Sequence, residues 1–258
     1  MQQAGTGPVL LLVHGTGGST HSWAECLEAL AANWTVLAID LPGHGFTHVP
    51  PAVERQGDIF ALRGMANGVA ALLRALGLSP ARVVGHSAGV PVLLQLCLDG
   101  AITPDRVLGC NPALVAPPTI YTTLIAPLVG AVVERDVVAR GGAWMAASTR
   151  IIDTMLSSSG TPLSAAQLGR YRWLCSKPAH VHAALTMMSR WDLPRLQREA
   201  LALRVPLHLL AGTRDRWVPP DALRRVVERL PTATFEAIEA GHLIPEERPD
   251  LVIERLAR

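Results

Sequence analysis

The chain has 258 residues, of which 49% are hydrophobic and 17% charged, and its formal net charge is +2 at pH 7. That length allows one large domain or two small ones, and the composition supplies enough apolar side chains for a large core. The nearly balanced charge, with no basic run longer than a pair such as Arg224-Arg225, gives no indication of a nucleic acid partner.

Short apolar runs alternate with helical patterns in the first part of the chain. The continuous apolar run over residues 8–13 is typical of a strand that is buried on both faces. After a glycine-rich loop, the pattern predicts a helix over residues 21–33, a strand over 34–39, a helix over 59–76 that ends at Gly77, a strand over 81–85, a helix over 90–96 and a strand over 106–110.

The character of the chain changes near Asn111. Residues 107–133 carry no charge, and prolines and glycine interrupt this run. From there to about Met188 the sequence predicts helical segments rich in Met, Trp and Ala, with no strand signal. The alternation then resumes with a strand over residues 205–210, a helix over 221–230, a strand over 234–239 and a helix over 246–256.

This order of elements predicts an α/β fold. Strands that alternate with helices form a mostly parallel sheet with helices on both of its faces. The helical stretch is then an insertion that lies over the C-terminal ends of the strands, where open α/β sheets bind ligands. We therefore expect a core formed by residues 1–112 and 191–258, and an inserted helical cap over residues 113–190.

The segment Gly85-His86-Ser87-Ala88-Gly89 joins a predicted strand directly to a predicted helix. It has the Gly-x-Ser-x-Gly pattern of a nucleophile elbow, in which a strained backbone exposes the serine hydroxyl. The two glycines leave room where a Cβ would collide with the neighbouring strand and helix. A glycine-rich turn with an incidental serine is the alternative, because short motifs depend on their structural context. His86 is expected to face away from the catalytic base.

A serine hydroxyl needs a base to take its proton, and the base needs an acid to orient it. In the elbow fold these partners follow in the order Ser, then Asp or Glu, then His. Asp215 and His242 each follow a predicted strand, so both fall on the same sheet edge as Ser87. The position of a rival acid, after the strand over residues 106–110, holds Asn111, which carries no carboxylate.

Asp215 and His242 also have simpler interpretations. Asp215 would serve equally as a helix cap, and His242 would pack against the apolar residues that follow it. Three suitable residues in the correct order after successive strands argue against coincidence. The sequence therefore predicts a triad of Ser87, Asp215 and His242.

The oxyanion hole of such a site needs two N–H donors. One is expected from Ala88 and the other from Thr16, in a glycine-rich loop whose backbone can approach a substrate closely. This loop lacks the Gly-Lys-Ser/Thr of a phosphate-binding loop and the spacing of a dinucleotide-binding motif, so we expect no cofactor. We also expect no metal, since His180 and His182 would point in different directions on a helix.

Several motifs resemble those of the α/β-hydrolase superfamily along nearly the whole chain: His14-Gly15, Asp40-Leu41-Pro42-Gly43-His44-Gly45, the elbow at Ser87, Asp215 and Gly241-His242. A narrower likeness is to the magnesium chelatase accessory hydrolases of bacteriochlorophyll biosynthesis. The segments that carry it are His14-Gly15-Thr16-Gly17-Gly18-Ser19-Thr20-His21-Ser22-Trp23, Leu41-Pro42-Gly43-His44-Gly45-Phe46-Thr47, Cys97-Leu98-Asp99-Gly100, Met187-Met188-Ser189-Arg190-Trp191-Asp192-Leu193 and Glu246-Glu247-Arg248-Pro249-Asp250. Membership implies a role around magnesium insertion into protoporphyrin in a phototrophic bacterium.

The sequence departs from the superfamily at its start. Such hydrolases usually have two more strands before the His-Gly strand, and here only residues 1–7 precede it. We therefore expect the N-terminal strands to be missing, and the strand over residues 35–39 to be an exposed sheet edge that favours association.

Together the residues predict a cofactor-independent serine hydrolase, carboxylesterase-like, that acts on an ester or related acyl bond. The serine argues against a haloalkane dehalogenase or epoxide hydrolase, which resemble this fold but carry aspartate at the elbow. An apolar cap suggests a bulky hydrophobic substrate such as a tetrapyrrole ester. The residues expected to contact it are Trp144, Met145, Met155, Met188 and Leu243. The alternative is that these side chains simply pack the cap.

Two alternative functions remain open from the sequence. One is a general carboxylesterase, and the other is a non-catalytic accessory that binds a porphyrin or the magnesium chelatase subunits. The charge-free run over residues 107–133 also suggests peripheral contact with a membrane, although its prolines would break a spanning helix. The lack of a basic N-terminal start and of paired cysteine spacing predicts a cytoplasmic protein with free thiols.

Overall fold

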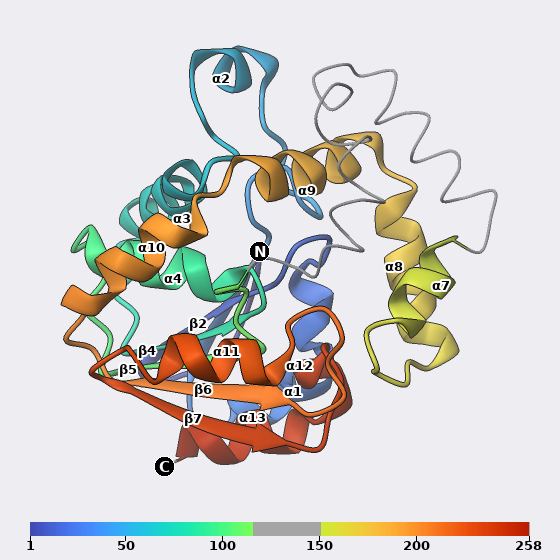
Figure 1. The fold of residues 1–258 in the computed structure, drawn as a ribbon. Coiled ribbons are helices and arrows are strands. Elements are labelled where there is room, and N and C mark those ends of the chain that lie inside the picture. The colour runs from blue at the N-terminus through green and yellow to red at the C-terminus, as the bar shows by residue number, and fades with distance from the viewer. Residues whose placement is uncertain (116–150, 258) are drawn as a thin grey trace.

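The computed structural model describes residues 1–115 and 151–257 (Figure 1). Within these ranges the strands form one seven-stranded sheet in the order β1-β3-β2-β4-β5-β6-β7. Their bounds are β1 (Gln2–Ala4), β2 (Val9–Val13), β3 (Thr35–Ile39), β4 (Arg82–His86), β5 (Arg106–Cys110), β6 (Leu207–Gly212) and β7 (Ala233–Ile238). All neighbours from β3 to β7 are parallel, and β1 is antiparallel to β3. The predicted α/β class with a mostly parallel sheet is confirmed.

Helices cover both faces of this sheet. Those described are η1 (Thr20–Trp23), α1 (Ala24–Ala31), α2 (Pro51–Gln56), α3 (Leu62–Leu76), α4 (Gly89–Leu98), α7 (Ile151–Ser157), α8 (Ala165–Cys175), α9 (Pro178–Arg190), α10 (Leu193–Glu199), η2 (Ala200–Ala202), α11 (Pro220–Val227), α12 (Ile244–Glu247) and α13 (Pro249–Ala257). Each of these helices among the described residues is too short or too polar to span a membrane. Residues 116–133 of the charge-free run lie outside the described residues, so its membrane contact stays a prediction.

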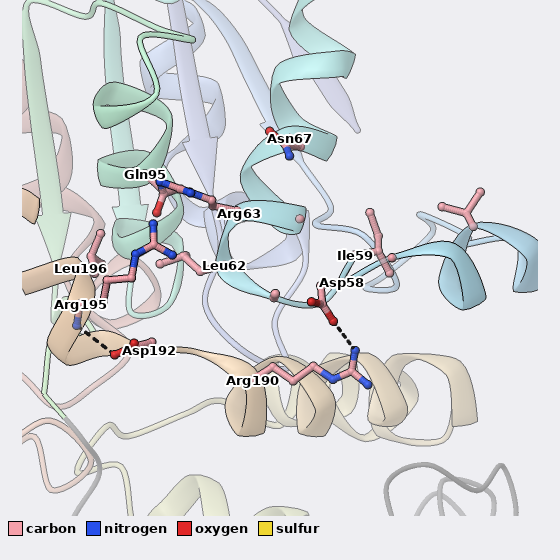
Figure 2. A pocket seen from close by; sticks show the side chains of 14 residues that line it. Asp58, Ile59, Leu62, Arg63, Asn67, Gln95, Arg190, Asp192, Arg195 and Leu196 are labelled. Atoms are coloured by element: carbon pink, nitrogen blue, oxygen red, sulfur yellow. Dashed lines mark hydrogen bonds and ion pairs between the residues drawn. The ribbon is translucent and has the colours of Figure 1, made fainter.

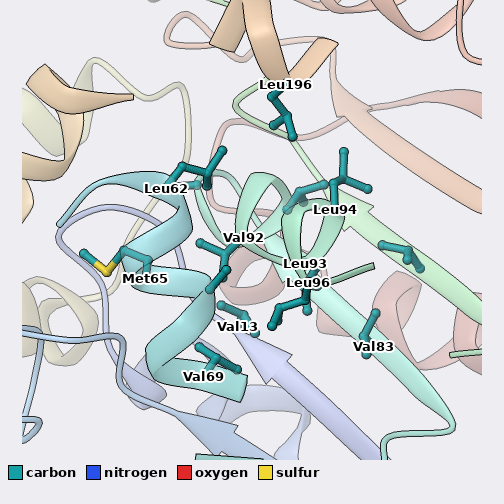
Figure 3. Close-up of a cluster of buried hydrophobic side chains, with 14 of the residues drawn as sticks. Val13, Leu62, Met65, Val69, Val83, Val92, Leu93, Leu94, Leu96 and Leu196 are labelled. Atoms are coloured by element: carbon teal, nitrogen blue, oxygen red, sulfur yellow. The ribbon is translucent and has the colours of Figure 1, made fainter. Parts of the chain in front are cut away.

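The apolar side chains divide into two main clusters because successive residues of a strand point to opposite faces. Leu11 and Val13 of β2 face a cluster built with α3, α4, α10 and α11, part of which Figure 3 shows around α3 and α4. Leu10 and Leu12 of the same strand face the other cluster, built with α1 and α13. A strand such as β2 therefore needs apolar residues at every position. The continuous apolar runs of the sequence reflect this burial on both faces.

The expectation that residues 35–39 form an exposed sheet edge is wrong. Gln2, Gln3 and Ala4 pair antiparallel with Ala38, Leu37 and Val36. The chain reverses between β1 and β2 through Gly5, whose φ of 78° lies in the left-handed region. The polar segment of β1 carries no apolar pattern, and its backbone hydrogen bonds alone make it a strand. The sheet edge is thus a three-residue strand, which offers little backbone for pairing with another chain.

Other boundaries differ slightly from the predictions. The helix expected from residue 21 begins with the 3₁₀ turn η1, and α3 ends at Gly77 as predicted, with a φ of 64° there. The short helices α2 and α10 were not predicted, since their sequences give little helical periodicity. Between β5 and β6 the described chain over residues 151–190 is helical and contains no strand, as expected. Figure 1 shows α9 across the upper part of the molecule, below α2, with α7 and α8 packed together at one side.

A buried carboxyl group joins the inserted helix α8 to the rest of the molecule. Glu246 of α12 is buried and accepts a hydrogen bond from the Tyr171 hydroxyl of α8. The Gln167 side chain, also from α8, donates to the backbone carbonyl of Glu246 at 3.2 Å. Glu246 Oε2 has no hydrogen-bond partner. Burial raises the pKa of Glu246 to about 7, although the Tyr171 hydrogen bond acts in the opposite direction.

This raised pKa predicts that Glu246 makes the free energy of unfolding depend on pH. The folded protein binds the proton more tightly than the unfolded chain, so stability falls as the pH rises from about 4.5 to about 7. Glutamine in its place cannot ionise and keeps the oxygen that accepts from Tyr171. Glu246→Gln should therefore raise the free energy of unfolding by about 2 kcal/mol at pH 8 and change it little at pH 4.5.

Urea unfolding at the two pH values measures this difference. The matched control is Glu228→Gln, because Glu228 is exposed at the end of α11 and no gain is expected there. An equal change for Glu246→Gln at both pH values would show that ionisation of Glu246 does not oppose folding.

Candidate active site

Ser87 occupies the sharp turn between β4 and α4. Its φ of 49° is in the left-handed region, which costs a residue with a side chain roughly 1–2 kcal/mol. The Ser87 amide donates to the Cys110 carbonyl at 2.8 Å, and its own carbonyl accepts from Val90 and Ala113. These bonds hold the strained conformation. The elbow expected at this position is therefore formed.

The two glycines of the elbow are required by close packing of the backbone. A Cβ at Gly85 would lie 2.7 Å from the amide nitrogen of Val90. A Cβ at Gly89 would lie 2.1 Å from the carbonyl oxygen of Val13. Both distances are below any real Cβ contact, so no larger residue fits without displacing backbone.

Asp215 and His242 meet after the ends of β6 and β7. His242 Nδ1 lies 2.7 Å from Asp215 Oδ2, and both side chains are buried. The other carboxylate oxygen accepts from the amides of Trp217 at 2.7 Å and Val218 at 3.0 Å. Because a carboxylate accepts at Nδ1, the proton of the neutral imidazole is on that atom and Nε2 keeps its lone pair. This is the orientation that a catalytic base requires.

His86, the residue before Ser87, contacts the residue predicted as the catalytic base. The rings of His86 and His242 have centroids 5.1 Å apart, and His86 Nε2 donates to the His242 carbonyl at 2.9 Å. The expectation that His86 faces away from the base is therefore wrong. Burial lowers the pKa of His86 to about 3, so it is a neutral donor at pH 7. Among the described residues no hydrogen bond joins Ser87 Oγ to His242, and such bonds are often long before substrate binds.

Asn111 fixes the loop that carries His242. It follows β5 with a φ of 45°, a conformation that asparagine tolerates better than most residues. Its Nδ2 donates to the carbonyls of Gly241 and His242, both at 2.8 Å, and its Oδ1 accepts from the Gly212 amide at 2.7 Å. Asn111, whose position excludes a rival acid, therefore connects the C-terminal ends of β5, β6 and β7 through hydrogen bonds. A polar residue directly after a buried strand was the only sequence signal for this role.

The segment after α7 supports the same loop from the other side. The His242 amide donates to the Ser159 carbonyl at 2.9 Å, and the Leu243 amide donates to Thr161 Oγ1 at 2.9 Å. A Cβ at Gly241 would lie 2.3 Å from the backbone of Gly160, so the two chain segments touch directly. The inserted region is therefore part of what holds the base in place.

The glycine loop after β2 forms a tight turn beside the nucleophile. The Gly18 amide donates to the Gly15 carbonyl at 3.0 Å, and Gly17 has a φ of 71°, as the third residue of a type II turn requires. A Cβ at Gly15 would lie 2.9 Å from the Ser87 Cβ. Within the described residues, neither the Thr16 amide nor the Ala88 amide donates a hydrogen bond. Both remain available as the predicted oxyanion donors.

The residues expected to contact substrate are not gathered at one described site. Met155 of α7 and Met188 of α9 are 38% and 43% exposed, while Leu243 is buried in an apolar cluster with Ile152 and Leu156. Trp144 and Met145 lie outside the described residues. Substrate contact by these five residues stays a prediction.

A separate cavity of about 520 Å³ lies between α3, α10 and the end of α9, and none of the predicted site residues lines it (Figure 2). Its arginines are each near a carboxylate, such as Arg190 with Asp58 at 3.1 Å and Arg195 with Glu199 at 2.7 Å. In the part of the chain that the structure covers, no cluster of His, Cys, Asp or Glu side chains is arranged to hold a metal ion.

The chain matches a known protein family over most of its length. A model described as the alpha/beta hydrolase family matches residues 10–255. The chain belongs to the alpha/beta hydrolase family. It is 36% identical over 249 residues to the magnesium-chelatase 30 kDa subunit of Rhodobacter capsulatus, covering 95% of this chain and 84% of that protein. Both levels of the resemblance found in the sequence are thus confirmed.

A further relative and a solved structure are also similar to this chain. A soluble epoxide hydrolase of a Corynebacterium species is 26% identical over 274 residues, covering 97% of this chain and 89% of that protein. The crystal structure of an enol-lactonase from Burkholderia xenovorans LB400 superposes with a TM-score of 0.75 at 22% identity, covering 99% of this chain and 94% of that one. At that identity the likeness to the enol-lactonase shows the fold alone.

The role of Asn111 predicts a large effect from a small substitution. In Asn111→Asp a carboxylate oxygen replaces the amide group that faces the two carbonyls, so acceptors face acceptors in a buried place. The free energy of unfolding at pH 8 should fall by about 3 kcal/mol. Urea unfolding measures it, with Asn67→Asp as the control, since Asn67 is exposed on α3. Equal stability of the two variants would contradict the role given to Asn111.

Proposed function

We propose that this protein is a serine hydrolase that acts on an ester or related acyl bond. The observation that carries the proposal is the buried pair of Asp215 and His242, 2.7 Å apart, in a chain whose strained Ser87 lies in the turn between β4 and α4. An imidazole that a carboxylate orients is the base that activates a serine hydroxyl for attack on a carbonyl.

The proposed reaction proceeds in two halves. His242 Nε2 takes the hydroxyl proton as Ser87 Oγ attacks the carbonyl carbon, and Asp215 stabilises the imidazolium that forms. The amides of Thr16 and Ala88 bind the oxyanion. When the intermediate collapses, His242 gives the proton to the departing alcohol, which leaves an acyl group on Ser87. Water then attacks the acyl group with His242 again as base, which releases the acid and restores Ser87.

The elbow residue separates this chemistry from that of some relatives. Haloalkane dehalogenases and epoxide hydrolases resemble this fold but carry aspartate at the elbow, where its carboxylate attacks carbon. Ser87 instead forms an acyl ester, which suits acyl-bond hydrolysis without a cofactor. The serine supports the proposal of a carboxylesterase-like activity.

For the substrate we propose a bulky hydrophobic ester, with a tetrapyrrole ester as the first class to examine. Residues 113–190 would form a cap over the site, and residues 1–112 and 191–258 the core. Met155 and Met188 are partly exposed on this cap, where a hydrophobic ligand can reach them. The relative named as a magnesium-chelatase subunit supports a place beside magnesium chelatase in bacteriochlorophyll biosynthesis, with the chelatase subunits as partners.

Labelling with a fluorophosphonate probe tests the proposed chemistry. The purified protein should take up one label per chain, and Ser87→Ala should lose it, because only an assembled triad activates a serine toward such probes. His242→Ala should label at least about 100-fold more slowly, as expected for loss of the general base. The control Ser189→Ala, on an exposed position of α9, should label like the wild type. Labelling that survives in Ser87→Ala would overturn the assignment.

The name of the same relative also favours a second candidate, a non-catalytic accessory that binds a porphyrin or the chelatase subunits. The two candidates differ in what they require of Ser87. If Ser87→Ala supports magnesium insertion in a pathway assay as well as the wild type, the accessory role holds. If the variant fails while still folded, hydrolysis is the physiological role.

A further inference from the structure

His180 of α9 connects the inserted helices to two loops of the sheet edge. It is almost fully buried, at 2% exposure. Its Nδ1 accepts from the Gly45 amide at 3.1 Å, and its Nε2 donates to the Gly17 carbonyl at 3.1 Å. Because Nδ1 accepts, the ring must be the neutral tautomer with its proton on Nε2. Burial favours the same form, since it lowers the pKa of His180.

The Gly17 carbonyl belongs to the turn that carries Thr16. Within this turn Gly18 donates to Gly15, and Gly17 adopts its left-handed φ. A hydrogen bond to the Gly17 carbonyl fixes the plane of the Gly17–Gly18 peptide, whose N–H closes the turn onto the Gly15 carbonyl. The proposed oxyanion donor at Thr16 is one residue away. A 1 Å displacement of such a donor is enough to lose much of its effect.

The second loop that His180 contacts is itself rigidly held. Asp40 accepts from the Phe46 amide at 3.1 Å with one carboxylate oxygen, and from the Thr20 amide at 2.8 Å with the other. Ala183, one helical turn after His180, packs so closely on Gly43 that a Cβ there would lie 2.5 Å from the Ala183 Cβ. The loop around Gly45 is thus held in one position. His180 connects this loop to the glycine turn through its two hydrogen bonds.

We infer that His180 is a positioning residue for the oxyanion turn, so that hydrolysis requires α9 to be docked on the two loops. This inference rests on the proposed hydrolase function. It gives the inserted helices a role in the chemistry beyond covering the site. When α9 leaves its place, the Gly17 carbonyl loses its donor, and the Gly15–Thr16 peptide is left with the bonds that the Gly15 carbonyl accepts from the Gly18 amide and from His14 Nδ1.

Three variants test the inference. His180→Ala removes both hydrogen bonds. His180→Gln offers an amide N–H to the Gly17 carbonyl and an amide oxygen to the Gly45 amide. His182→Ala is the matched control, because His182 lies on the same helix and instead contacts Glu54 at 2.7 Å. Circular dichroism and thermal unfolding establish that each variant is folded.

The first readout is amide hydrogen exchange, which needs no catalysis. The Gly18 amide is protected by its bond to Gly15 and should exchange at least about 10-fold faster in His180→Ala, while the amide of Leu12 in β2 stays unchanged. His180→Gln should restore most of the protection. Unchanged exchange at Gly18 in His180→Ala would overturn the inference.

The second readout is hydrolysis of a p-nitrophenyl ester together with the rate of fluorophosphonate labelling. His180→Ala should lower kcat and the labelling rate by about 10- to 100-fold with KM changed less than about 3-fold, because the turn acts on the transition state. His180→Gln should recover most of kcat, and His182→Ala should match the wild type. A rise in KM with kcat unchanged would assign His180 to substrate binding and contradict the inference.

The two readouts separate failure of the inference from failure of the proposed function. If the wild type neither labels nor hydrolyses, the hydrolase function fails, and the exchange data still decide whether His180 positions the turn. If the wild type is active and His180→Ala behaves like His182→Ala in both measurements, the function stands and the inference is wrong.

Discussion

The site depends on how closely the backbone packs at the C-terminal edge of the parallel sheet. Strands β2, β4, β5, β6 and β7 end side by side there, in a register that places His86 beside Cys110 and Cys110 beside Leu210. At this edge backbone lies directly against backbone, and only glycine fits at Gly85, Gly89 and Gly241. The strained turn at Ser87 is stable because these contacts and its backbone hydrogen bonds determine it from every side.

Buried neutral side chains hold the loops at this edge with further hydrogen bonds. His14, His86 and His180 are each buried with a lowered pKa, so each acts at pH 7 as one donor and one acceptor and not as a charge. Asn111 adds two donated hydrogen bonds and one accepted bond at the same sheet edge. Such bonds are stronger in a buried site than in water, and an unmatched partner there is costly. The network therefore specifies one arrangement of the loops that carry Ser87, Asp215 and His242.

The sequence predicted the parts of this arrangement that depend on local pattern. The continuous apolar runs gave the buried strands, and the order of Ser87, Asp215 and His242 after successive strands gave the pair that the structure brings to 2.7 Å. What could not be predicted depends on long-range contacts. The roles of His86, Asn111 and His180 come from partners 101–163 residues away along the chain. Strand β1 is polar and is formed by backbone pairing alone, which leaves no trace in the hydrophobic pattern.

We propose Ser87 as a nucleophile placed between an oriented His242 and the amides of Thr16 and Ala88. A crystal structure of the protein after reaction with a fluorophosphonate tests it most directly. We expect the phosphorus on Ser87 Oγ, with the phosphoryl oxygen about 2.7–3.1 Å from the amide nitrogens of both Thr16 and Ala88. An adduct on another residue, or a phosphoryl oxygen that contacts neither amide, would contradict the account.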